Sequence, residues 1–197
     1  MEHSSADLIA AGATILLAFV VVPMWILAGL ADYLCHRASD IEHTAGTRES
    51  ALHLIQFGLV GIPLTAALFF QVDAGLLAIM VLFIVLHHAV AYIDVRYANG
   101  QRGISPLEQM VHSFLELLPI TAFLLLCTLE FSQVRAALGF SAEQADFGIH
   151  LRRQPLHTGY IAFVMLSAAV IDFLPYLEEL VRCVRAARRK ADVAPAS

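Results

Sequence analysis

The sequence predicts an all-α, polytopic membrane protein with five transmembrane helices, the first four forming an antiparallel bundle around a metal site. Of its 197 residues, 59% are hydrophobic and only 15% are charged, whereas soluble proteins average roughly 45–50% apolar and about 25% charged residues. A bilayer must therefore cover much of the apolar surface. In addition, acidic residues and histidines recur at the ends of the apolar segments, which predicts where the site lies.

Five apolar segments are long enough to cross a hydrocarbon core of roughly 30 Å as helices. The fourth is expected to begin at Ser105-Pro106, because serine caps a helix and proline suits its first position. A short interfacial helix is expected within residues 130–155. One domain, residues 1–190, would precede a disordered tail, residues 191–197. The predicted segments run from Leu8 to Ala31, Ala51 to Val72, Gly75 to Ile93, Pro106 to Leu129 and Leu156 to Tyr176.

The positive charges predict the orientation. If the N-terminus lies outside, nine of the twelve lysine and arginine residues fall on the inner side, as the excess of positive charge in cytoplasmic loops requires. The C-terminus is then cytoplasmic, and the expected location is a bacterial inner membrane. The net charge of −5 provides no basic surface for nucleic acid, so the predicted partner is the lipid bilayer.

Acids and histidines of the first four helices would meet at the inner leaflet, because helices one and three end there and helices two and four begin there. With a rise of about 1.5 Å per residue, positions four apart return to nearly the same face. His87 is preferred over its neighbour His88 because it lies in register with Asp94. The deeper level of candidate ligands is Asp32, His53, His87 and His112, and the shallower level is His36, Glu49, Asp94 and Glu108.

Two levels of four nitrogen and oxygen donors predict a dinuclear metal centre, as in four-helix bundles that bind two iron or manganese ions. Imidazole and carboxylate ligands suit iron, manganese or zinc, and the candidates include no cysteine, which disfavours a structural zinc site. Iron is the expected metal. Glu49 or Glu108 could bridge the two cations.

Glu116 lies one turn deeper than His112, in a fourth segment whose charge-free part covers only Leu117 to Leu129. An ionisable group at such depth usually faces the interior of a bundle and marks function. We expect a catalytic role for Glu116, with metal ligation, a hydrogen bond to a ligating histidine and proton transfer all open. Asp172 in the fifth segment is a second buried acid, without an assigned role.

The placement of the metals is similar to that in the membrane di-iron desaturases and hydroxylases, although the chain lacks their HxxxH and HxxHH boxes. It predicts a non-haem di-iron oxidoreductase that acts with O2 on a lipid-soluble substrate. An external electron donor would be needed, because no flavin, haem or iron–sulfur motif is present. The alternatives are a zinc-dependent membrane hydrolase, in which zinc activates water, and a carrier or sensor of metal cations. Two histidines binding haem is a minor fourth possibility.

Overall fold

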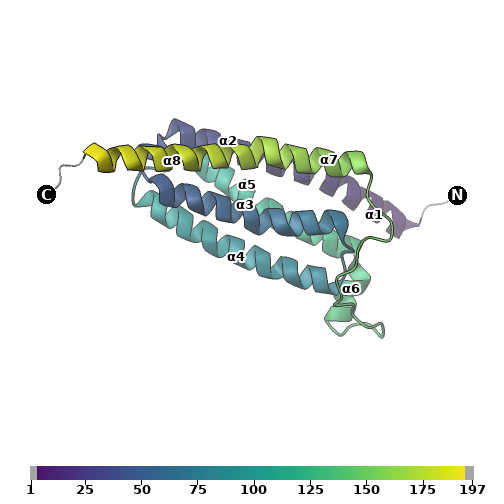
Figure 1. Ribbon diagram of the computed structural model, residues 1–197. Coiled ribbons are helices and arrows are strands. Elements are labelled where there is room, and N and C mark those ends of the chain that lie inside the picture. Colours follow the sequence, from purple (N-terminus) through teal and green to yellow (C-terminus); the bar gives the residue numbers. More distant parts are fainter. Residues whose placement is uncertain (1–3, 194–197) are drawn as a thin grey trace.

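The computed structural model describes residues 4–193, and the regular elements in that range are helices apart from one isolated β-bridge. Five long helices lie side by side in an elongated bundle (Figure 1). The first is continuous through α1 (Ser5–Leu16), the π-helical turn η1 (Leu17–Val21) and α2 (Val22–Ala38). The next three are α3 (Gly46–Phe69), α4 (Ala74–Asn99) and α5 (Pro106–Leu129). The fifth comprises α7 (Thr158–Ser167), the π-helical turn η3 (Ala168–Phe173) and α8 (Leu174–Val193).

All five helices are long and apolar enough to cross a membrane, which confirms this part of the sequence prediction. Large apolar side chains such as Phe19, Val85 and Leu124 are exposed on the outside of the bundle. In water this surface would be costly, whereas lipid tails would cover it without penalty. The fold is therefore compatible with a protein embedded in a bilayer.

The five helices pack in a ring. α2 packs against α5, α5 against α4, α4 against α3, and α3 against α8, while η3 and α8 return to α2. The sequence prediction formed the bundle from the first four helices. In the structure the fifth helix lies between the first and the second, so residues of α8 also face the interior.

The start of α5 lies where the sequence predicts it. Ser105 caps α5, because its hydroxyl accepts a hydrogen bond from the backbone N–H of Glu108 at 3.1 Å. The short helix predicted within residues 130–155 is α6 (Phe131–Ala137), and a 3-10 turn, η2 (Ile41–His43), joins α2 to α3. α8 continues to Val193, so residues 191–193 of the predicted tail are helical and residues 194–197 lie outside the described part.

The fifth helix approaches α2 closely at Gly29. A β-carbon at this position would lie 2.6 Å from Oδ1 of Asp172 in η3, which is closer than van der Waals contact allows. The hydroxyl of Tyr176, one turn further on, shares its proton between the Gly29 carbonyl at 3.2 Å and Oδ2 of Asp32 at 3.0 Å. Glycine therefore lets η3 and α2 pack with Asp172 between them.

Gly29→Ala is expected to lower the free energy of unfolding by about 1–3 kcal/mol, because extra volume in a packed interior forces the neighbouring groups to shift. The matched control is Gly12→Ala in α1, where a β-carbon meets nothing within 4 Å. Thermal unfolding in detergent would compare the two variants. Equal stability of both would show that the contact between Gly29 and Asp172 does not restrict the packing.

Candidate metal centre

Seven of the eight predicted ligands gather at one end of the ring, where α2, α4 and α8 carry their polar residues and α3 and α5 begin. Six of them are at most 4% exposed, and His112 is largely buried. Ionisable groups buried among membrane helices are costly unless something compensates their charge. The seven are Asp32 and His36 of α2, Glu49 and His53 of α3, Asp94 of α4, and Glu108 and His112 of α5.

Asp32 lies between two imidazoles. Its Oδ1 is 2.9 Å from Nε2 of His112 and 3.6 Å from Nε2 of His36. The same His36 nitrogen is 3.6 Å from Oε1 of Glu108. Asp32, His36 and His112 each offer one ligand atom within a space small enough for a metal ion.

A second group forms around His53. Its Nε2 is 3.3 Å from Oδ2 of Asp94, and Glu49 completes a set of three atoms that could hold an ion. Gln56 donates a hydrogen bond to Oδ2 of Asp94 at 2.9 Å and so orients that carboxylate. His36 also forms a possible ligand group with Glu49 and Glu108. These two carboxylates therefore connect the group around Asp32 with the group around His53.

Glu179 of α8 is a fully buried residue that the sequence prediction missed. Its Oε1 hydrogen-bonds to Nδ1 of His53 at 2.9 Å, and its Oε2 lies 3.3 Å from Nδ1 of His36. The two rings stack with centroids 4.1 Å apart and planes 6° apart. A carboxylate facing Nδ1 favours the tautomer with its proton on Nδ1, which leaves the Nε2 lone pair free for a metal. Glu179 thus aligns two candidate ligands.

Arg102, in the loop between α4 and α5, is a second group that the sequence prediction missed. Its Nη2 donates to Oε1 of Glu49 at 2.6 Å and to Oε1 of Glu108 at 2.5 Å. Its Nε and Nη1 reach the second oxygens of the same carboxylates at 3.3 and 3.0 Å. Burial lowers the pKa of Arg102, but the hydrogen bonds to Glu108 and Glu49 outweigh it and hold that pKa above its usual range. The guanidinium therefore remains charged.

The charges of the cluster do not balance within the protein when the histidines are neutral. Five buried carboxylates then face one guanidinium, which leaves four negative charges, the number that two divalent cations would neutralise. The carboxylates are Asp32, Glu49, Asp94, Glu108 and Glu179.

Several buried atoms of the cluster also lack a hydrogen-bond partner among the described residues. An unpaired buried polar atom costs about 1–3 kcal/mol, so a ligand at these atoms would stabilise the protein. They face the same small space from which the possible metal groups are drawn, so the residues present fit a metal centre. The atoms are His36 Nε2 and Asp94 Oδ1, together with Asp32 Oδ1 and His53 Nε2, which lie 2.9 Å from His112 and 3.3 Å from Asp94 but without hydrogen-bond geometry.

His87, predicted as a ligand, stands apart from this cluster. It is 3% exposed, and no hydrogen bond or ion pair among the described residues joins it to the acids. The neighbouring His88 hydrogen-bonds through Nδ1 to the Ile84 carbonyl of its own helix at 2.8 Å, and no ion pair among the described residues joins it to the acids either. Seven residues separate His87 from Asp94, which places them about 10 Å apart along the helix. His87 therefore belongs to the cavity beside the cluster.

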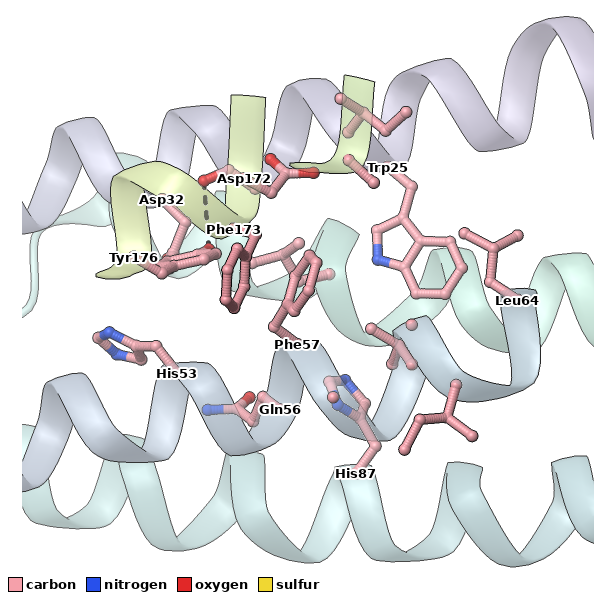
Figure 2. Close-up of a pocket in the computed structure, with 18 of the residues that line it drawn as sticks. Trp25, Asp32, His53, Gln56, Phe57, Leu64, His87, Asp172, Phe173 and Tyr176 are labelled. Carbon is pink, nitrogen blue, oxygen red and sulfur yellow. Dashed lines mark hydrogen bonds between the residues drawn. The ribbon is translucent and has the colours of Figure 1, made fainter. Parts of the chain in front are cut away.

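This cavity has a volume of about 590 Å³ and extends from the cluster into the apolar half of the bundle. Figure 2 shows Asp32, His53 and Tyr176 at one end and Trp25 and Leu64 at the other. The Tyr176 hydroxyl donates a hydrogen bond to Oδ2 of Asp32 at 3.0 Å (dashed in Figure 2). The tyrosine thus links the cavity wall to a candidate ligand.

The cavity lies between α3 and the α7–η3 part of the fifth helix. Ile62 of α3 and Met165 of α7 both line it, and they are 58% and 38% exposed on the outer surface of the bundle. A hydrophobic molecule could therefore enter sideways from a bilayer. Glu116, the predicted catalytic acid, is half-buried in the cavity wall beyond His112.

No family model matches this chain, and no match was found among curated proteins or solved structures. The chemistry of the site must therefore be inferred from its own residues.

Proposed function

We propose that this protein is a membrane-embedded dinuclear-metal oxidoreductase, with iron as the metal, that uses O2 to oxidise a lipid-soluble substrate. One observation carries the proposal: buried carboxylates and imidazoles with unpaired ligand atoms adjoin an apolar cavity that reaches the outer surface of the bundle. Metal ligands buried beside an apolar pocket are the arrangement that oxidation of a hydrophobic molecule requires.

The geometry suggests how the ligands are shared. One ion would be held by His36, His112 and Asp32, with Glu108 beside them. The other would be held by His53, Asp94 and Glu49. His87 has no place in either set. Nitrogen and carboxylate donors of this kind suit iron and manganese, and they also accept zinc.

The surrounding residues would keep these ligands in place. Glu179 orients His36 and His53, Gln56 orients Asp94, and Tyr176 orients Asp32. Such supporting hydrogen bonds fix the direction of the lone pairs that a metal needs. Iron bound here would supply the activation of O2, and the apolar cavity would keep bulk water away from the reaction.

Glu116 is the proposed proton-transferring group, because it is the carboxylate in the cavity wall that lies outside the cluster on α5.

The proposed orientation keeps the cluster at the cytoplasmic side, since nine of the twelve basic residues lie at that end of the five helices. The N-terminus is then outside the membrane.

Elemental analysis of protein purified without added metal tests the proposal. We expect two ions per chain, mainly iron, and a severalfold loss in His53→Ala and in His112→Ala. The control is His150→Ala, because His150 is exposed and pairs with Asp146 away from the cluster. A content of one ion or none, or equal content in all variants, would contradict the proposal. Full occupancy by zinc with activity independent of O2 would support a hydrolase instead.

A further inference from the structure

Two polar side chains of the cavity are buried without a partner. His87 of α4 is 3% exposed, and neither of its ring nitrogens makes a hydrogen bond of full geometry among the described residues, although the backbone of Leu115 lies near the ring. Asp172 of η3 is 7% exposed, and its Oδ1 is also unpaired. Leaving such atoms without a partner costs about 1–3 kcal/mol each. They are therefore suited to bind polar groups of a ligand.

These two side chains approach the cavity from opposite walls (Figure 2). His87 extends from α4, whereas Asp172 lies across the cavity next to α2. Aromatic side chains line the space around them: the rings of Phe57 and Phe173 have centroids 5.7 Å apart, and the Trp25 indole lies beside them. A flat, apolar ring with a polar group at each of two opposite edges would match this arrangement.

We infer that the cavity binds a quinol, a flat ring with hydroxyl groups on opposite edges and an isoprenoid tail. One hydroxyl would hydrogen-bond to His87, and the other would donate to the Asp172 carboxylate. The tail would leave between α3 and the α7–η3 part of the fifth helix, past Ile62 and Met165. Cavities of about 300–1,000 Å³ hold ligands of this size, and this one measures about 590 Å³.

A simple acyl chain fits the same cavity less well. It would fill the apolar part of the cavity but would offer no hydrogen-bonding group to Asp172 or His87. The free-energy cost of leaving these buried polar atoms unpaired would therefore remain. The aromatic walls would also have no flat partner to stack against. The observed polar and aromatic residues therefore favour the ring over the chain.

This inference rests on the proposed function and names its lipid-soluble substrate. Two quinols would give up four electrons and four protons, and one O2 would take them up to form two water molecules. Each O–H bond that breaks would release its proton to Asp172 or His87, and Glu116 would pass the protons on to the oxygen that is reduced to water. The electrons would pass to the metal centre at the end of the cavity, and two quinone molecules would leave. The quinol would thus be the electron donor, so no separate donor protein would be required.

Binding can be measured on metal-free protein, because Trp25 is the single tryptophan of the chain and lines the cavity. A ligand bound beside an indole changes its fluorescence, so titration with decylubiquinol, kept reduced by the exclusion of O2, should give saturable quenching at one site per chain. His87→Leu and Asp172→Leu should each weaken binding by tenfold or more, and His87→Gln should restore part of it. The control is His88→Leu, because His88 hydrogen-bonds to its own helix and should leave binding unchanged.

Quenching that rises without saturation, or equally in all variants, would overturn the inference. Strong quenching by dibromostearate that decylubiquinol does not displace would also overturn it, in favour of an acyl chain. Saturable quinol binding by a protein that holds no metal would support the binding site while the proposed oxidase fails. Two bound metal ions without quinol binding would support the metal centre while the quinol inference fails.

Discussion

Glu179→Gln is expected to weaken metal binding roughly 10- to 100-fold, the usual effect of losing a carboxylate that supports a metal ligand. Glu179 faces Nδ1 of both His36 and His53. The amide can accept an N–H from one ring, but its NH2 group faces the other, which must then move its proton to Nε2. That histidine would lose the lone pair that binds the metal. Elemental analysis after dialysis against a range of chelator concentrations would measure the loss.

The neighbouring residue provides the control. Glu178 has a side chain 46% exposed and pairs with Arg37 on the surface, so Glu178→Gln should keep its metal. If the cluster instead balances its charge with protonated histidines, Glu179→Gln would lower stability without any metal-dependent difference. Addition of iron would then leave the melting temperature of the unmodified protein unchanged. That result would argue against the metal centre.

Arg102→Met is expected to reduce the stability of the metal-free protein by about 3–5 kcal/mol, because removing one partner of a buried ion pair leaves uncompensated charge. The Arg102 side chain is 4% exposed and forms ion pairs with both Glu49 and Glu108. Methionine fills similar space without the charge. Divalent metal should restore much of the lost stability, because its positive charge would lie close to the same carboxylates. Thermal unfolding with and without metal would measure both effects.

Arg37→Met is the matched control. Arg37 forms its ion pair with Glu178 at the surface, where its side chain is 54% exposed, and exposed pairs of this kind contribute about 0–1 kcal/mol. The Arg37→Met variant should therefore have nearly the same free energy of unfolding as the unmodified protein, with or without metal. A destabilisation of Arg102→Met that metal does not reduce would show that the carboxylates need the guanidinium itself and do not bind a cation.

The helices could be predicted from the sequence because apolar length alone determines whether a segment can cross a bilayer. Their ends were harder to place. The first helix continues to Ala38 and the fifth to Val193, well beyond the apolar segments, because polar residues such as Asp32 and Glu179 continue the helical turns and face the interior. Hydropathy reports where a helix meets lipid, and it does not report where a helix ends.

Part of the cluster could be predicted from the periodicity of the helix. Residues four apart share a helix face, so Asp32 with His36 and Glu49 with His53 converge as expected. His87 lies outside these groups, because the seven residues between it and Asp94 make two full turns, which keep the helix face and change the depth. Glu179 was missed because it stands beside the exposed Glu178 and before a run of basic residues. Arg102 was missed because its contacts depend on how a loop folds back.

The position of the fifth helix has a consequence for biogenesis. It is synthesised last, yet it supplies the carboxylate that faces His36 and His53 and the hydroxyl that holds Asp32. A nascent chain with four inserted helices would carry these acids and imidazoles without their final neighbours. Translation proceeds from the N-terminus at about 5–20 residues per second, so such a state must exist for seconds. Maturation of the centre would therefore follow synthesis of the fifth helix, and a ribosome-bound intermediate lacking residues 158–193 should be unable to bind the metal ions.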